Sequence, residues 1–497
     1  MKKFSYFCLT LVLMLSYACV KEEAVTTTQQ PEYRVLGADD ASLVNPESAV
    51  SSLFSMLSAM DESDETRSGE LTYNILSQEL VSIEDIIGVT RAEIDEEALQ
   101  NSFYIVNIED NLGRRRSAIL GASENLPPIL AIMNGGDLAL SDFEDAWQSM
   151  NGNTELLQTR SSLVESEPIN TAPLENIISY MTFPTPMPGP DNGLTPGTGG
   201  GGGNNGGQND NPNDDYTVIR TESYSWVPKN GIGPLLYSHY NQGTPFNDDY
   251  DVNPNTGVKY YAGCGVVALA QILTYCKNER GFGPDVISGK LINWYRIDQG
   301  VLKQSYAYDR FGMNYILTIV ECTEDECDEF AKLHRAIFDA SDATPQSNGA
   351  VGLSRIKARN FLREYNFIEP TKCDYSDDLI NLMLFDRQLP IYIGGYCTAC
   401  GGGHAWVIDG KRRCERYANK VYIEYVDGVE VNRYGVSVET GDEDTFIHCN
   451  WGYEGYRDGY FYSGIFDSPN AITRSTEDCP VDNYSIDNEV IIYDINN

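Results

Sequence analysis

The first part of the chain combines short apolar runs with turn-forming residues. Apolar residues recur at helical spacing in residues 49–60, which predicts a helix. The apolar runs 103–108 and 117–122 flank a turn-rich segment and predict a β-hairpin, and residues 129–133 predict a further strand. No nucleophile, metal cluster or acid–base pair stands out here, which indicates a regulatory or structural role.

The second half of the chain carries longer apolar patterns. Residues 264–273 follow a turn and have the spacing of a mostly buried helix. Residues 401–410 predict a strand behind a run of glycines, and residues 446–461 predict a strand, a Gly-containing loop and a return strand. Residues 411–444 predict an additional hairpin between them. Helices and hairpins in both parts predict an α+β fold.

A stretch rich in Pro, Gly, Asn and Asp separates the two parts. Residues 183–215 cannot bury a core and are typical of a flexible, protease-accessible linker. We therefore expect a leader at 1–18, a polar tether at 19–40, a first domain at 41–182 and a second domain at 216–497.

The leader has the pattern of an exported protein. Lys2 and Lys3 precede an apolar run, 4–17, that is too short to span a bilayer but suits a signal-peptide core. Ala18-Cys19 resembles the cleavage site of a bacterial lipoprotein, with Cys19 as the lipid-bearing residue, and the Lys-Glu-Glu that follows resembles a surface-export signal of some Gram-negative bacteria. We expect an outer-membrane lipoprotein at the cell surface, or a protein secreted after processing. An ordinary signal peptide with an incidental cysteine is the alternative.

Charge and cysteine content narrow the classes of function. The chain of 497 residues has 35 Lys and Arg against 73 Asp and Glu, a net charge of −38, which argues against nucleic acid or an anionic membrane surface as a partner. Apart from Cys8 and Cys19, all of the 12 cysteines lie between Cys264 and Cys479. Chemistry that needs a thiol therefore belongs to the second domain.

Cys264 and His404 are the strongest candidates for chemistry. Cys264 falls at the start of the predicted buried helix, where unpaired backbone N–H groups and the helix dipole favour a thiolate. The chain has only 4 histidines. His404 follows a run of glycines that lets another chain approach its ring, whereas His334 has the helical pattern of a surface or core residue.

A third segment supplies the group that a cysteine–histidine pair needs to hold its imidazole. Asn450 can accept a hydrogen bond from His404 Nδ1, and Trp451 can shield that bond from water. The order Cys, His, Asn along the chain is that of papain-like proteases.

Together these segments resemble the streptopain-like cysteine peptidases, a branch of the papain-like fold. A fourth segment, 238–247, resembles that family's cleft upstream of the nucleophile and holds Gln242, which could help to bind the oxyanion. The resemblance implies that Cys264 is the nucleophile, His404 the general base, Asn450 the orienting residue and Trp451 its aromatic neighbour.

The resemblance covers residues 221–497 and, more loosely, the first domain, which looks like an inhibitory pro-domain. It implies a papain-like catalytic domain preceded by a smaller α+β pro-domain, made as a zymogen. Protein or peptide substrates would be the partners, with the pro-domain as an intramolecular inhibitor and no metal or cofactor. A preference for an apolar side chain two residues before the scissile bond is also implied.

Other interpretations stay open. The additional hairpin departs from the family's compact pattern. Surplus cysteines in an exported chain favour disulfides, and a four-thiolate zinc site is the alternative for the four cysteines nearest His404 in sequence. Those four are Cys397, Cys400, Cys414 and Cys449. The rival functions are a Cys-His acyltransferase of the transglutaminase type and a non-enzymatic surface lipoprotein on a peptidase scaffold.

Overall fold

A computed structural model provides the structure of this chain. It describes residues 44–61, 71–82, 85, 102–122, 126–143, 216–311, 322–347, 349–397, 402–426, 429–463 and 488–496. The predicted leader, tether, lipid-bearing Cys19 and linker lie outside the described residues, as do Cys400 and Cys479. The predicted domain boundaries therefore stay predictions.

The chain divides into two compact units. The described part of the smaller unit consists of the strand residues 216–220 and of most of Val421–Gly435, which belongs to the additional hairpin. There, Tyr422 and Tyr434 stack with ring centroids 5.2 Å apart, and Asn432 Nδ2 donates to Glu424 Oε2 over 3.1 Å. The predicted hairpin is thus present, and the larger unit holds all other described residues.

The strands join one sheet with the order β1-β2-β3-β4-β14-β13-β12-β11-β15-β10, and β5 also pairs with β12. Their bounds are β1 Tyr73–Val81, β2 Phe103–Asp110, β3 Arg115–Gly121, β4 Ala131–Asn134, β5 Tyr216–Ile232, β10 Ile368–Asp374, β11 Ile391–Cys397, β12 Gly402–Val426, β13 Val429–Asn450, β14 Gly459–Tyr462 and β15 Glu489–Asp494. Two short pairs lie apart from it, β6 Val286–Ile287 with β7 Lys290–Leu291 and β8 Thr344–Pro345 with β9 Val351–Gly352. The hairpin of β2 and β3 and the strand β4 confirm the pattern expected of the first part.

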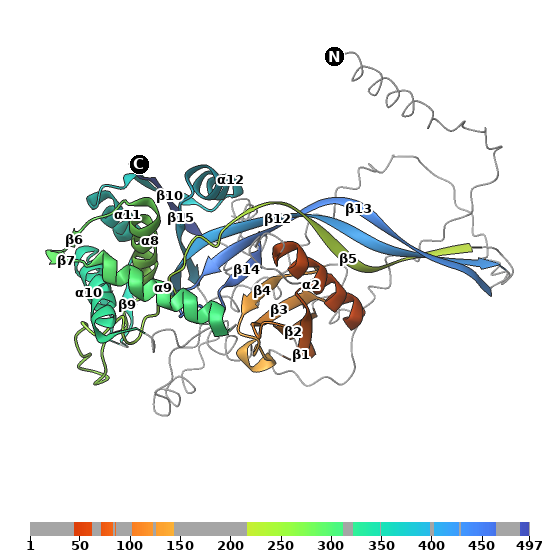
Figure 1. The fold of residues 1–497 in the computed structure, drawn as a ribbon, viewed down its shortest axis with the longest axis horizontal. Coiled ribbons are helices and arrows are strands. Elements are labelled where there is room, and N and C mark those ends of the chain that lie inside the picture. Colours follow the sequence, from red (N-terminus) through yellow and green to blue (C-terminus); the bar gives the residue numbers. More distant parts are fainter. Residues whose placement is uncertain are drawn as a thin grey trace, which may run out of the picture. The chain divides into compact units, whose positions relative to one another are not determined.

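Side-chain alternation along the strands divides the interior into two cores. Phe103 and Ile105 of β2 pack in one cluster, and Tyr104, Val106 and Ile108 pack in the other. Successive side chains of a strand point to opposite faces, so the clusters lie on opposite faces of the sheet. The helix α2 (Pro46–Asp61), predicted from residues 49–60, covers the second cluster beside β2 and β3 (Figure 1).

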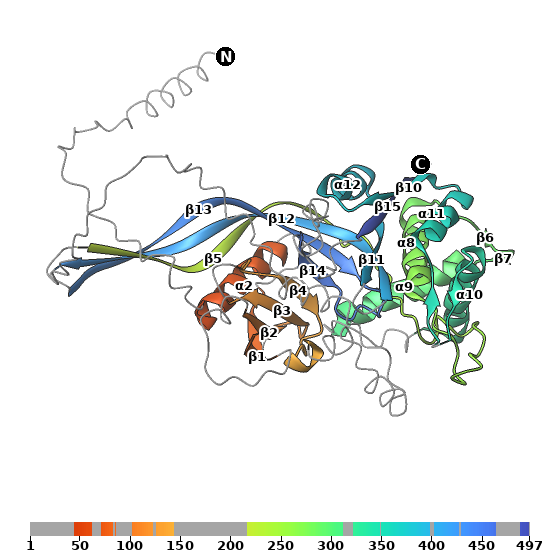
Figure 2. The ribbon, with the colours of Figure 1, turned by 180° about the vertical axis from the view of Figure 1, so that it is seen from behind.

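The helix α8 (Cys264–Arg280) is buried along most of its length and packs against α9 Trp294–Phe311, α10 Glu324–Ala340 and α11 Arg355–Glu364. The helix α12 Asp377–Asn381 and the π-helical turn η2 Leu382–Arg387 follow α11 in the chain. Figure 2 shows α8, α10 and α11 grouped beside β11 and β15. Mixed helix and sheet confirm the predicted α+β class. Among the described residues, no helix has both the length and the apolar character that a membrane span requires.

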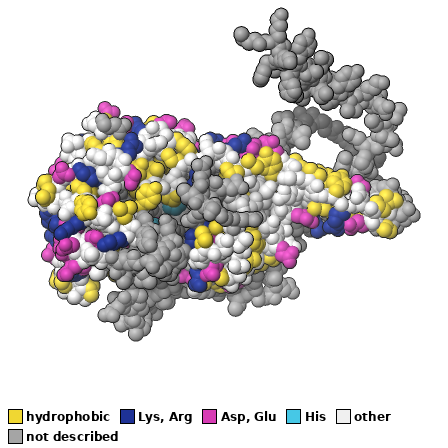
Figure 3. Space-filling model, viewed as in Figure 1, with side chains coloured by type: hydrophobic (Ala, Val, Ile, Leu, Met, Phe, Trp, Pro, Cys, Tyr) yellow, Lys and Arg dark blue, Asp and Glu magenta, His cyan; other side chains and the backbone are white. Residues whose placement is uncertain are grey.

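Charged side chains of both signs are interspersed on the face over these helices (Figure 3).

Fewer cysteines form disulfides than predicted. Free thiols are carried by Cys264, Cys276, Cys327, Cys373, Cys414 and Cys449. Disulfides are therefore absent at these six positions, contrary to the expectation. Cys414 and Cys449 also pack in the two different cores, so they do not share a four-thiolate site.

Candidate active site

The thiol of Cys264 lies at the first residue of α8, as predicted. Gly263 precedes the helix with a φ of 89°, a conformation that favours glycine. The backbone N–H groups of Ala405, Gly265 and Cys264 itself face the sulfur. Burial raises the pKa of the Cys264 thiol, and these three N–H groups oppose that rise because they stabilise a thiolate.

The imidazole of His404 lies on β12, opposite Gly395 of β11. Its Nε2 is 3.2 Å from the Trp451 carbonyl oxygen, to which it donates as the protonated nitrogen. The ring is flanked by aromatic side chains, with centroid distances of 5.9 Å to Trp406, 6.0 Å to Trp451 and 5.5 Å to Tyr453. Burial lowers the pKa of His404 to about 4, against the bond to Trp451, which favours the imidazolium.

The fold places Cys264 beside the strand that carries His404. Ala405, whose N–H faces the Cys264 sulfur, directly follows His404 on β12. Burial shifts both pKa values toward the uncharged forms, so the thiol and the neutral imidazole dominate in this structure. Such a pair can act by proton transfer from sulfur to imidazole as the sulfur attacks.

Asn450 does not hold the ring of His404, contrary to the prediction. Its Oδ1 accepts from Gln271 Nε2 over 2.6 Å and from the Gly452 N–H over 3.1 Å, and its Nδ2 donates to the Ser238 carbonyl over 3.1 Å. These bonds tie α8, the segment before the nucleophile and the loop after β13 together. The orienting acceptor is instead the main-chain carbonyl of the next residue, Trp451.

The other two predicted residues lie in the same region. Trp451 is fully buried, and its ring contacts those of His404 and Trp406. The Gln242 carbonyl accepts from the Ala262 N–H over 2.8 Å, which places its main chain beside the residues that lead into Cys264. An oxyanion-binding role for the Gln242 side chain stays a prediction.

Three residues of this site were missed. Trp406 and Tyr453 flank the His404 ring, and the buried Asp458 accepts a bond from the Trp451 N–H over 2.8 Å. Trp406 stands two positions after His404 on the same strand, so strand periodicity could have placed it on the same face. Nothing in the sequence pattern singles out Tyr453 or Asp458, because the fold of their loop decides what they contact.

The remaining histidines have other surroundings. His448 Nδ1 lies 2.6 Å from Asp409 Oδ1 in the core. His334 of α10 is fully buried and contacts the Phe330 carbonyl through Nδ1 over 2.8 Å, which confirms it as a core residue. His239 Nδ1 lies 3.8 Å from Asp458 Oδ2.

The predicted pro-domain segment contacts the strand after this site. β4 pairs antiparallel with β14, with Met133 opposite Gly459 and Ala131 opposite Phe461. The Arg457 guanidinium is 1% exposed, at 3.4 Å from Asp137 and 3.3 Å from Asp142. The residues just before and within β14 therefore bind the first part of the chain through both main-chain bonds and charge.

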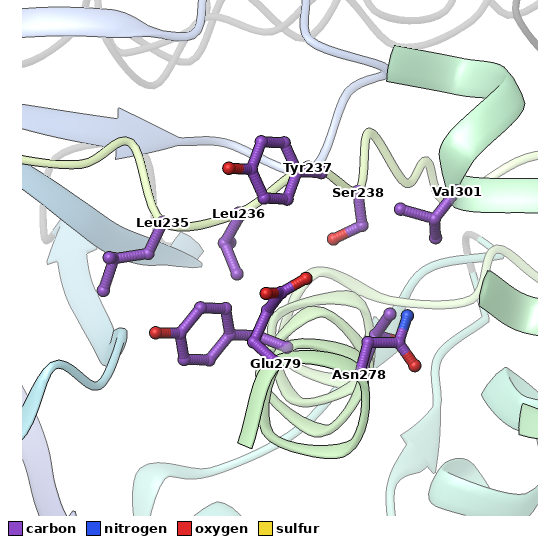
Figure 4. Close-up of a pocket in the computed structure, with 9 residues that line it drawn as sticks. Leu235, Leu236, Tyr237, Ser238, Asn278, Glu279 and Val301 are labelled. Carbon is purple, nitrogen blue, oxygen red and sulfur yellow. The ribbon is translucent and has the colours of Figure 1, made fainter. Parts of the chain in front are cut away.

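A small pocket lies at the far half of α8 from Cys264. Leu235, Leu236, Tyr237, Ser238 and Val301 line one side of it, and Thr274, Tyr275, Asn278 and Glu279 of α8 line the other (Figure 4). Neither Cys264 nor His404 lines this pocket. It is therefore separate from the candidate active site.

Comparison with known proteins identifies this region. Residues 240–461 match the sequence model of the Peptidase C10 family, which confirms the predicted resemblance to the streptopain-like peptidases for this segment. No curated protein matches the chain. Among solved structures, it is similar to a fragment of prointerpain A from Prevotella intermedia, with 14% identity and a TM-score of 0.41 over 78% of this chain and 94% of that one.

Proposed function

We propose that this chain, whose residues 240–461 match a cysteine peptidase family, is an endopeptidase with Cys264 as nucleophile and His404 as general base. One observation carries the proposal. The Cys264 sulfur faces the N–H of Ala405, the residue that follows His404, while the His404 ring is bonded to the Trp451 carbonyl. The thiol at the start of α8 thus lies beside the strand that carries an oriented imidazole.

The proposed reaction has two steps. In the first, the Cys264 proton passes to His404 while the sulfur attacks the peptide carbonyl, and the imidazolium then protonates the leaving amine as the C–N bond breaks. In the second, His404 takes a proton from water while the water oxygen attacks the acyl carbonyl; the C–S bond then breaks, the new carboxyl terminus leaves, and the proton passes from His404 to the Cys264 sulfur. Backbone N–H groups at the start of α8, aided by Gln242, would stabilise the oxyanion.

We also propose that the chain is made as a zymogen. The support is the contact of the first part of the chain with the end of the active-site loop, through the β4–β14 pairing and the buried Arg457. Cleavage in the linker 183–215 would separate the two parts. Export, with lipid attachment at Cys19, is proposed from the leader sequence alone.

The test compares the full-length chain without its leader with three variants, under reducing conditions. Mass spectrometry follows the chain itself and a denatured protein substrate. Cys264→Ala and His404→Ala should show no new chain ends, whereas Cys373→Ala, which removes another free thiol, should cut as the wild type does. Amidated or crosslinked products would indicate acyl transfer. Inactivity even after an added protease cuts the linker would contradict the peptidase proposal and favour a binding protein.

A further inference from the structure

We propose that Asp458 is a positioning residue for His404, acting through the peptide groups of Trp451. This proposal rests on the proposed function, since it assigns His404 the role of general base. His404 lacks a side-chain acceptor among the described residues, because Asn450 bonds elsewhere. Its ring is held by a main-chain carbonyl. Whatever fixes that carbonyl therefore fixes the ring.

Asp458 holds Trp451 directly. Its Oδ1 accepts from the Trp451 N–H over 2.8 Å, and its side chain is 2% exposed. Such a buried hydrogen bond is costly to break, because the donor left behind has no water to replace its acceptor. The bond closes the loop from Trp451 to Asp458 upon itself.

The loop between these two residues is tightly wound. Four of its residues have a positive φ, with values of 75°, 54°, 80° and 63°. They are Gly452, Glu454, Gly455 and Arg457. Non-glycine residues adopt such angles only when surrounding bonds hold them there. The hydrogen bond from the Trp451 N–H to the Asp458 carboxylate is one of these bonds, since it joins the end of the loop to its beginning.

Trp451 passes this constraint to the catalytic ring. Its N–H is held by Asp458, and its carbonyl accepts from His404 Nε2 over 3.2 Å. With Nε2 donating to that carbonyl, Nδ1 carries the free lone pair and is the nitrogen that can take the thiol proton. Fixing Trp451 thus selects the tautomer that a general base requires.

Other charged groups face Asp458 and must be separated from this role. His239 Nδ1 lies 3.8 Å from its other oxygen. Burial raises the pKa of the Asp458 carboxyl, while His239, the Trp451 N–H and the charge of His448 oppose the rise. The neighbouring Arg457 is directed to Asp137 and Asp142. The proposal requires an oxygen of residue 458 that accepts from the Trp451 N–H, and it does not require that residue 458 be charged.

Two substitutions separate the acceptor from the charge. Asp458→Asn keeps an oxygen for the Trp451 N–H, and Asp458→Leu removes it at similar volume. In the activated full-length enzyme we expect kcat to fall about 100-fold in D458L with KM little changed, and by no more than a few-fold in D458N. The acid limb of the kcat/KM profile should move to lower pH in D458L, because the imidazolium of His404 loses the fixed acceptor that favours it.

Two controls keep the outcome decisive. Asp409→Asn alters another buried aspartate, which bonds His448, and should leave the acid limb in place. The pH dependence of Cys264 alkylation by iodoacetamide, followed by peptide mass spectrometry in the full-length chain, reports the thiol–imidazole pair without peptidase activity. If D458L fails to fold, Asp458→Ala replaces it in both measurements.

The results distinguish the two proposals. Wild-type-like kcat and pH profiles in D458L, or equal losses in D458N and D458L, would overturn the positioning role. A wild-type chain that hydrolyses no peptide would contradict the proposed function, and the alkylation profiles would still decide the role of Asp458.

Discussion

His404 and His448 are histidines of neighbouring strands with opposite environments. His404 of β12 contacts a main-chain carbonyl and three aromatic rings, all of them neutral. His448 of β13 is bonded to the carboxylate of Asp409, whose second oxygen accepts from the Leu236 N–H over 3.1 Å. The His404 ring is held through Nε2 and keeps Nδ1 available to accept a proton. The His448 ring, through Asp409, instead links β13 to the segment around Leu236.

In this chain the hydrogen-bond partner, rather than burial, distinguishes the proposed general base His404 from His448. Both side chains are largely removed from water. The Asp409 carboxylate links the His448 ring to a second buried donor, the Leu236 N–H, whereas the Trp451 carbonyl fixes the His404 ring and leaves its Nδ1 able to accept a proton.

The sharpest test of the contrast removes each ring in turn. His404→Ala should lower kcat/KM by at least about 10⁴-fold, because it deletes the general base. His448→Gln should retain activity per folded molecule and lower the free energy of unfolding. Peptide hydrolysis normalised to the folded fraction checks both. Equal losses of turnover in the two variants would remove the distinction.

Deleting the carboxylate of the structural pair should affect stability above all. Asp409→Ala leaves His448 and the Leu236 N–H without their acceptor in the core. We expect it to lower the free energy of unfolding by about 2–6 kcal/mol, because two buried donors each lose their acceptor at a cost of about 1–3 kcal/mol. Urea denaturation at pH 7 measures this. Unchanged stability would show that the pair is dispensable.

Burial of neutral histidines should make stability depend on pH. The pKa of His404 and of the core residue His334 is lowered to about 4 from the usual 6.5. Between these values the unfolded chain binds more protons, so the free energy of unfolding falls as pH drops from 6.5 to 4.

For the fully buried His334 this loss amounts to about 3 kcal/mol. His334→Leu should reduce the slope of the unfolding free energy between pH 7 and pH 4.5, as urea denaturation at each pH will show. The matched variant His448→Gln tests whether removal of any buried histidine reduces the slope of the unfolding free energy with pH. A slope that His334→Leu leaves unchanged would contradict a neutral, buried His334.

The smallest expected effect concerns Asn450. Because it bonds Gln271, Ser238 and Gly452 rather than His404, Asn450→Ala should lower kcat less than about tenfold. Its cost should appear as about 1–3 kcal/mol of unfolding free energy, because buried partners lose their bonds. Steady-state kinetics with thermal denaturation would separate the two. A loss of activity as large as in His404→Ala would restore Asn450 as the orienting residue.

Much of the fold was visible in the sequence because it depends on local patterns. Helical spacing predicted α2 and the start of α8, and paired apolar runs predicted the β2–β3 hairpin and the additional hairpin. The positions of Cys264 and His404 followed from the same patterns, since a helix start and a glycine-flanked strand are local features.

The contacts within the site could not be predicted in this way. Asn450 is one residue from the group that holds His404, yet its side chain points to Gln271, which is 179 positions away in the chain. The free thiols of Cys414 and Cys449 show the same limit, because residues close in the expected site pack in different cores.

The sequence by itself therefore determined which residue types stand at helix starts and strand ends, and hence which residues we propose as nucleophile and base. Tertiary structure alone decided which acceptor holds the imidazole and which carboxylate supports that acceptor. The reason is physical: periodicity places a side chain on a face, but hydrogen bonds depend on distances of about 3 Å between segments that only the folded chain brings together.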